Sequence, residues 1–109
     1  MEKLNVVFLS LGSNLGEREK HITQALHDLS DRGVQLVSTS SYFYSDPVGF
    51  DSEHQFCNCC VKMLTSLDPF SLLHVIREIE AQNGRLVKSK NGIYADRTID
   101  IDIIFFNQL

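Results

Sequence analysis

Residues 97–106 read RTIDIDIIFF, and this stretch constrains the fold more than any other part of the sequence. Its alternation is typical of a β-strand, in which successive side chains point to opposite faces of a sheet. The alternation places Asp100 and Asp102 on one face, with their Cα atoms about 6.6 Å apart at the usual rise per residue. Continued to the end of the stretch, it predicts Ile104 and Phe106 on that face as well. The sequence therefore predicts a strand with two neighbouring carboxylates on one of its faces.

Two interpretations of the paired acids stay open on this stretch alone. Asp is a poor strand residue and two of them repel each other, so a divalent cation between them is one interpretation. The other is a half-exposed strand whose acids simply face water. Two features favour the cation: the apolar Ile104 and Phe106 on the same predicted face, and the basic connection at residues 84–96 that leads into the strand. A cationic connection beside an acidic metal site is what a polyphosphate ligand requires.

The rest of the chain predicts three further strands and two helices. Residues 4–11 form a nearly continuous apolar run, typical of a buried central strand, and residues 34–43 and 54–63 predict two more strands. Apolar residues at helical spacing predict a helix after Asn14, as its N-cap, and a second helix after Asp68. The order is strand, helix, strand, strand, helix, strand. It predicts an α+β fold, the ferredoxin-like split βαβ sandwich, with a four-stranded antiparallel sheet and two helices on one face.

Composition narrows the class of protein. A chain of 109 residues is long enough for one domain over residues 1–109 with a single core. The net charge of −4 is spread along the chain, which argues against a nucleic-acid surface. No apolar run approaches the ~20 residues of a membrane span, and the start lacks the features of a secretory signal. We therefore expect a cytoplasmic protein that binds neither nucleic acid nor membrane.

Three cysteines lie close together at Cys57, Cys59 and Cys60. Their odd number, with no distant partner, gives no disulfide framework. Cys57 and Cys60 match a CxxC spacing, but on a strand they point to opposite faces and cannot hold one metal ion. We interpret all three as thiols of a reducing compartment, small enough to be buried.

Phe56 and Asn58 are predicted to share the face of their strand that lies opposite Cys57 and Cys59. A ring for stacking and an amide with both a donor and an acceptor are what a planar nitrogenous ligand requires. The preceding irregular loop around Pro47 could present its main chain to such a ligand. An ordinary strand connection and a structural asparagine are the alternatives. The glycine-flanked GSNLG near the start lacks the lysine and the spacing of a phosphate-binding loop, so we interpret it as a tight turn.

Three segments, SLGSNLG, YSDPVGF and YADRTIDIDIIFF, occur in an order that resembles the 6-hydroxymethyl-7,8-dihydropterin pyrophosphokinase family over essentially the whole chain. The family signature is an Arg, two spacer residues and DxD, which Arg97, Asp100 and Asp102 match. The resemblance implies transfer of pyrophosphate from ATP to 6-hydroxymethyl-7,8-dihydropterin, with release of AMP, in tetrahydrofolate biosynthesis. It also implies that the two acids hold two Mg²⁺ ions on the triphosphate of ATP, the co-substrate, and that Arg97 belongs to the catalytic set.

The resemblance also assigns the substrate contacts. Those to the pterin fall on Ser45, Pro47, Val48, Phe56 and Asn58. Those to the nucleotide fall on Glu80, Arg85, Lys88, Tyr94 and Arg97. Some positions depart from the family's usual residues: Phe56 stands for Tyr, Tyr94 for Trp, Arg77 for Gln, and Val87 and Lys88 stand where a second Arg is common.

Members of the family continue past the DxD strand with a segment that bears a His, an Arg and an aromatic residue. We therefore expect this chain to lack the C-terminal part of the family domain, and a form extended at its C-terminus to transfer pyrophosphate faster. The rival hypothesis is a non-catalytic ferredoxin-like module that binds a nucleotide, a pterin or a protein partner. A purely structural subunit, the third option, predicts no magnesium-dependent nucleotide binding.

Overall fold

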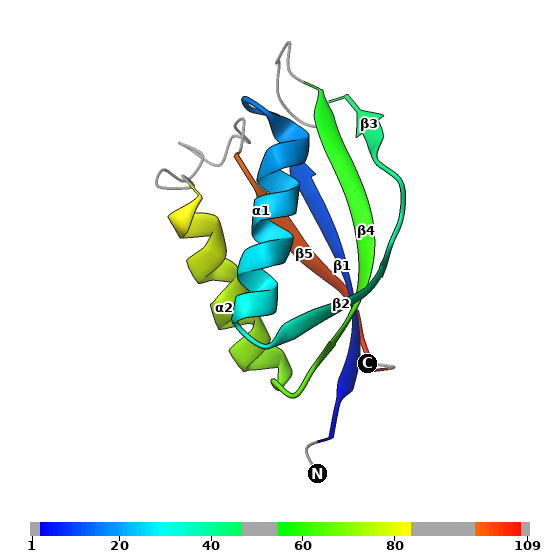
Figure 1. Ribbon diagram of the computed structural model, residues 1–109, viewed down its shortest axis with the longest axis vertical. Coiled ribbons are helices and arrows are strands. Elements are labelled where there is room, and N and C mark those ends of the chain that lie inside the picture. Colours follow the sequence, from blue (N-terminus) through cyan, green and yellow to red (C-terminus); the bar gives the residue numbers. More distant parts are fainter. Residues whose placement is uncertain (1–2, 47–54, 84–97, 108–109) are drawn as a thin grey trace.

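Two helices pack side by side on one face of an antiparallel sheet in the computed structural model of the chain (Figure 1). The structure describes residues 3–46, 55–83 and 98–107. The elements in chain order are β1 (Asn5–Ser13), α1 (Arg18–Asp31), β2 (Val34–Thr39), β3 (Phe43–Ser45), β4 (Phe56–Thr65), α2 (Pro69–Gln82) and β5 (Asp100–Phe106). No helix in these ranges is long and apolar enough to cross a membrane.

The main path of the sheet runs β2-β4-β1-β5, with every neighbouring pair antiparallel. This is the strand order of the split βαβ arrangement, so the predicted fold class is confirmed. The predicted strand over residues 34–43 is divided into β2 and the short β3, which both pair with the long β4. Ser40 lies at the division, where its Oγ accepts a hydrogen bond from the Cys60 amide at 2.9 Å. At this position the Ser40 hydroxyl, and not a main-chain oxygen, is the acceptor for the Cys60 amide of β4.

Alternation along the strands builds the core. The buried hydrophobic residues of β1 are Val7, Leu9 and Leu11, which precede the buried Gly12 and Ser13 at its end, and the buried residues of β4 are Cys57, Cys59, Val61, Met63 and Thr65. They face the buried side chains of the two helices, among them Ile22, Leu29, Leu72, Ile76 and Ile79. The predicted buried cysteines are confirmed for Cys57 and Cys59, and burial raises the pKa of both thiols. Cys60 lies on the opposite face and is partly exposed.

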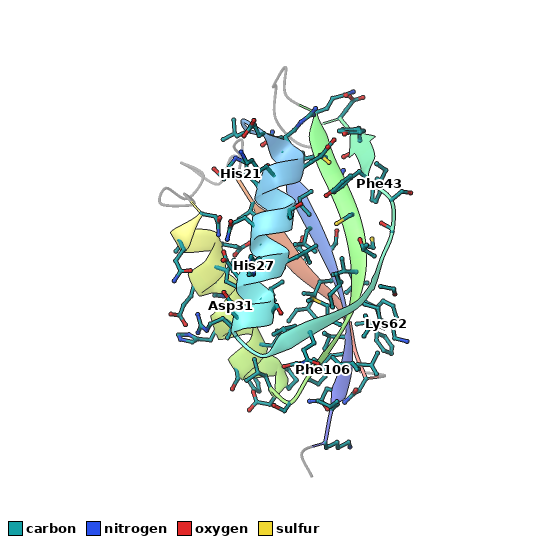
Figure 2. The ribbon with its side chains drawn as sticks, viewed as in Figure 1. His21, His27, Asp31, Phe43, Lys62 and Phe106 are labelled. Carbon is teal, nitrogen blue, oxygen red and sulfur yellow. The ribbon has the colours of Figure 1, made fainter. Side chains whose placement is uncertain are left out.

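A β-bulge in β5 changes the face of its last residues. The pairing with β1 shifts by one residue beside Phe8, which leaves Ile104 as the extra residue, 57% exposed. Beyond the bulge Phe105 packs against Phe8, with ring centroids 5.5 Å apart. Phe106 pairs with Val7 and is buried in the core, 7% exposed (Figure 2). The prediction that Phe106 shares the face of the two acids is therefore wrong, because one unpaired residue reverses the alternation.

The two helices begin differently. Asn14 is not the N-cap of α1: the chain passes through a turn with Gly16 at φ 63°, and Glu17 precedes the helix without a side-chain cap bond. The prediction for α2 is confirmed, because Asp68 Oδ1 accepts a hydrogen bond from the Ser71 amide at 2.7 Å and Pro69 is the first helical residue.

Leu9 in the central strand is fully buried, whereas Leu73 on α2 is 39% exposed. We expect Leu9→Ala to lower the free energy of unfolding by about 2–5 kcal/mol, since it removes packed methyl groups and leaves a cavity. Leu73→Ala makes the same chemical change at the surface and should cost less than about 1 kcal/mol. Urea unfolding of both variants measures the difference, and equal losses would contradict the assigned core.

The cap of α2 predicts a pH dependence of stability. The Ser71 amide donates to the Asp68 carboxylate and lowers its pKa. A lowered pKa in the folded state means that the carboxylate stabilises the fold above its unfolded-state pKa of about 4, and that this contribution is lost as the pH falls through the folded-state value. We therefore expect Asp68→Ala to destabilise the protein at neutral pH and to approach the wild type in stability below about pH 4.

Urea unfolding at a series of pH values measures this gap. Asp68→Asn is the matched control, because it keeps a capping oxygen but does not titrate. Its stability relative to Asp68→Ala should stay constant with pH. A constant gap between wild type and Asp68→Ala from neutral pH down to about pH 2 would contradict the assigned role of the carboxylate.

Candidate functional site

Three neighbouring strands bring predicted site residues into one row. In the middle strand β1, Gly12 pairs with Asn58 of β4 on one side and with Asp100 of β5 on the other. Two residues along, Ser10 pairs with Asp102 in the next row. Residues paired in this way share a face of the sheet, here the face away from the helices. Asn58 and Asp100 are thus two strand spacings, about 10 Å, apart.

The two acids lie at the surface of this row. Asp100 is partly exposed and Asp102 is exposed, as the hypothesis of water-facing acids also requires. The argument from Phe106 no longer supports a cation, since Phe106 belongs to the other face. What supports it is the identity of the donors: two carboxylates two residues apart on one strand face.

The donor set fits one kind of metal site. Among the described residues no group of three His, Cys, Asp or Glu side chains could hold a metal ion. A site that consists of a carboxylate pair is unlike a closed zinc or calcium site. Mg²⁺ is commonly bound by one or two carboxylates together with substrate phosphates. Asp100 and Asp102 therefore fit Mg²⁺ that arrives with a polyphosphate.

Asn58 is held in place at the other end of the row. Its Nδ2 donates to Ser45 Oγ at 2.8 Å, and more weakly to the main-chain oxygens of Phe56 at 3.3 Å and Phe43 at 3.4 Å. Ser45 and Phe43 come from β3, which pairs with β4 at this point. Figure 2 shows Phe43 beside β3, at the opposite edge of the view from α2. The structure thus brings together three predicted pterin contacts, Ser45, Phe56 and Asn58.

Gly12 is a site residue that the sequence analysis did not identify. A Cβ atom built on Gly12 would lie 2.9 Å from Asn58 Oδ1 and 3.3 Å from Phe56 Cδ1. Both side chains therefore occupy the space that any other residue would fill. The only signal in the sequence was a glycine that ends an apolar run, and we had assigned it to a turn.

Glu80 reaches the site from the helix layer. It lies in the last turn of α2, is 7% exposed, and its Oε2 accepts a hydrogen bond from the Ile101 amide at 3.0 Å. The resemblance assigns Glu80 to the nucleotide contacts, and the structure shows that this buried carboxylate has a main-chain donor in β5. Ile101 is the residue between the two acids.

A second cluster joins the start of α1 to β3. The Tyr44 hydroxyl donates to Glu19, and this bond raises the pKa of Tyr44 to about 12, so the phenol stays protonated. The Arg18 guanidinium lies 5.0 Å from the centre of the Tyr44 ring, and its Nη1 donates to the Gln55 main-chain oxygen at 2.8 Å. None of these residues was identified from the sequence. They tie β3 and the start of β4 to the helix layer.

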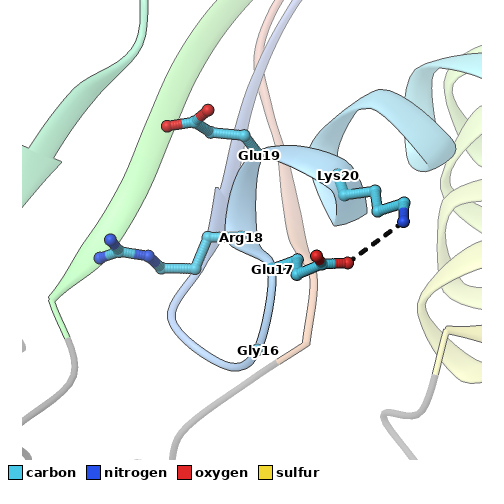
Figure 3. Close-up of a pocket in the computed structure, with 5 residues that line it drawn as sticks. All are labelled: Gly16, Glu17, Arg18, Glu19 and Lys20. Carbon is cyan, nitrogen blue, oxygen red and sulfur yellow. Dashed lines mark ion pairs between the residues drawn. The ribbon is translucent and has the colours of Figure 1, made fainter.

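A shallow pocket lies at the turn before α1 (Figure 3). Its lining alternates acidic and basic residues: Gly16, Glu17, Arg18, Glu19 and Lys20. Glu17 and Lys20 form an ion pair at 3.2 Å. A lining of mixed charge has no preference for phosphate. The interpretation of GSNLG as a tight turn is wrong for its first two residues, because Gly12 and Ser13 belong to β1 and the turn follows them at Gly16.

Six predicted site residues lie outside the described residues and remain predictions. They are Pro47 and Val48 of the pterin set, and Arg85, Lys88, Tyr94 and Arg97 of the nucleotide and catalytic sets.

Comparison with known proteins gives concordant matches. A family model described as 7,8-dihydro-6-hydroxymethylpterin-pyrophosphokinase matches residues 8–109. A protein of Porphyromonas gingivalis described as 2-amino-4-hydroxy-6-hydroxymethyldihydropteridine pyrophosphokinase is 43% identical over 99 residues, which are 91% of this chain and 67% of that protein. A protein of Bacillus subtilis with the same description is 39% identical over 105 residues, 95% of this chain and 61% of that protein. The chain thus spans about two thirds of the length of these relatives.

A solved structure shares the fold. The crystal structure of Plasmodium falciparum HPPK-DHPS with SDX-DHP aligns with 98% of this chain and 30% of that one, at a TM-score of 0.72 and 18% identity. At that identity the likeness concerns the fold alone.

The crowding at Gly12 gives a test of the row. We expect Gly12→Ala to displace the Asn58 amide from Ser45, since the added Cβ and Oδ1 cannot stay at 2.9 Å. The side-chain NH₂ signals of Asn58 in an amide NMR spectrum should then shift. Ser10→Ala on the same strand face is the control, because it adds no atom. Unchanged Asn58 signals in Gly12→Ala would show that the two residues do not meet as described.

Proposed function

Because the chain belongs to the 7,8-dihydro-6-hydroxymethylpterin-pyrophosphokinase family, we propose that it carries the metal-binding and pterin-binding face of such an enzyme. The reaction transfers pyrophosphate from ATP to the hydroxymethyl oxygen of 6-hydroxymethyl-7,8-dihydropterin. It yields AMP and the pterin diphosphate for tetrahydrofolate biosynthesis.

One observation carries this proposal: Asn58, Gly12 and Asp100 share a row across three hydrogen-bonded strands. One end of the row offers an amide and a ring, and the other end offers carboxylates. A planar nitrogenous acceptor and a metal-bound polyphosphate would therefore meet over the glycine. Phosphoryl transfer requires mainly such positioning and the neutralisation of charge, with little covalent chemistry from the protein.

At the acidic end, Asp100 and Asp102 are the residues that would hold two Mg²⁺ ions. Bound Mg²⁺ would neutralise phosphate charge and orient the triphosphate. The role of the protein itself would be to keep the two carboxylates on one face of the sheet at a fixed separation. The pairing of both residues with Gly12 and Ser10 of the central strand supports that role.

At the other end, Phe56 offers an aromatic face and Asn58 an amide to the pterin. Ser45 would act beside them, since its hydroxyl bonds the Asn58 amide. Pro47 and Val48 complete the proposed pterin set by resemblance. Phe56 keeps the stacking surface that the family's usual Tyr provides, and it lacks the hydroxyl.

The proposed nucleotide contacts come from two regions. Glu80 lies on α2 next to β5. The remaining contacts are proposed from the resemblance alone: Arg85, Lys88, Tyr94 and Arg97. The positive charges of Arg85, Lys88 and Arg97 would neutralise the phosphate oxygens that are not bound to a metal ion. The Tyr94 ring would contact the base. Arg97 is counted in the catalytic set because it matches the Arg of the family signature.

The partners that this function requires are ATP and the pterin, with no nucleic acid or membrane, and we expect the protein in the cytoplasm. A non-catalytic module that binds the same ligands is the second hypothesis, since the two acids and the Asn58 amide on the described face could bind ligands without turnover. Production of AMP from ATP, Mg²⁺ and hydroxymethyldihydropterin separates the two, because a binding module gives none.

We expect Asp100→Asn and Asp102→Asn each to lower the rate of AMP production by more than about 100-fold, because the metal ions lose a charged ligand. The fold should be retained, because neither side chain belongs to the core: Asp100 is partly exposed and Asp102 is exposed. Assays on the full reading frame that contains this chain, together with circular dichroism melting curves, measure both effects.

Asp31→Asn is the matched control. It makes the same change at the exposed end of α1, in the helix layer on the other side of the sheet (Figure 2). Its rate should equal that of the wild type. Release of AMP at the wild-type rate in either site variant would rule out the proposed metal ligands.

A further inference from the structure

β5 carries both acids but forms the end of the sheet. In the described part of the chain it pairs only with β1, so one of its long sides has no neighbouring strand. In an antiparallel pair, successive residues direct their main-chain N–H groups alternately toward and away from the neighbour. A residue of an edge strand whose N–H points away from the neighbour needs another acceptor.

Ile101 is such a residue, and Glu80 is its acceptor. Ile101 faces Leu11 in the register, while its amide donates to Glu80 Oε2 at 3.0 Å, on the side away from β1. By alternation, the main-chain groups of Asp100 and Asp102 point toward Gly12 and Ser10. The strand between the acids is thus held by β1 on one side and by a helix side chain on the other.

The surroundings make this bond a firm restraint. Ile101 is 4% exposed and Glu80 is 7% exposed, so water competes little for either group. Glu80 is fixed by its place in α2, whose neighbouring residues Ile76 and Ile79 are in the core.

We propose that Glu80 is a positioning residue for the two carboxylates: it fixes the main chain at Ile101 and thereby sets the separation of Asp100 and Asp102. The inference rests on the proposed function, since it gives that separation a purpose in holding Mg²⁺. It goes beyond a nucleotide contact, because the effect passes through the main chain of β5 and does not require the nucleotide.

Two substitutions separate geometry from charge. Glu80→Ala removes the acceptor, whereas Glu80→Gln keeps one oxygen that can accept the Ile101 N–H and removes the charge. Amide hydrogen exchange of Ile101 reports the bond itself in the metal-free protein. Mg²⁺ added together with inorganic triphosphate, followed through the amide shifts of Asp100 and Asp102, reports metal affinity without nucleoside or turnover.

In Glu80→Ala we expect Ile101 exchange to be faster by about tenfold or more, and Mg²⁺ to bind about 10–100-fold more weakly. In Glu80→Gln both should stay within about twofold of the wild type, because the bond persists. Glu78→Ala is the control on the same helix. Its carboxylate pairs with Arg32 at 3.0 Å and His74 at 2.9 Å, and it should change neither measurement.

Three results would overturn the inference: Ile101 exchange unchanged in Glu80→Ala, Mg²⁺ affinity unchanged there despite faster exchange, or losses in Glu80→Gln as large as those in Glu80→Ala. The Gln variant keeps the inference falsifiable even if the Ala variant does not fold. Failure of the proposed function looks different, since the wild type itself would then bind no Mg²⁺.

Discussion

The pairing of β1 with a strand on each side is the constraint on which the site depends. The inward side chains of β1 are core residues, Leu9 and Leu11 among them, and the outward positions are Ser10 and Gly12. Because the side-chain period of a strand is two, a slip of one residue would expose the core and bury the site face. Burial of leucines against the helices therefore fixes which residues of β4 and β5 meet on the open face. The energy that holds the fold together also sets the geometry of the site.

Much of this arrangement was predictable from local patterns. The order of elements, the cap of α2, the buried face of β4 and the shared face of Asp100 and Asp102 all follow from periodicity within single segments. What was missed depends on pairing between segments. The bulge at Ile104 reverses the face of Phe106, and the hydroxyl of Ser40 interrupts a predicted strand. Neither is visible in one strand alone, because both appear only when a second strand is laid beside it.

The functional assignment likewise combines features visible in single segments with features that appear only when strands pair. The acid pair by itself fitted both a cation site and a water-facing strand, and one of the two arguments for the cation, the position of Phe106, was wrong. The structure replaces that argument with a better one, since it brings Asn58, predicted from a different segment and for a different ligand group, into the row of Asp100. Two predictions made independently thus converge on one face. Membership of the pyrophosphokinase family then identifies the chemistry that such a face can serve.

The placement of the acids on an edge strand has a physical consequence. A polyphosphate with its metal ions needs open space beside its ligands, and an edge strand provides that space where a central strand cannot. In the described part of the chain, the same edge leaves main-chain groups without a strand partner. The Glu80 carboxylate on α2 accepts a hydrogen bond from the Ile101 N–H, and it does so without closing the open face because it approaches from the helix side. The core packing of α2 and the separation of the acids are therefore coupled: substitutions that shift Ile76 or Ile79 in the core should be felt at the carboxylates, although neither residue lies on the open face.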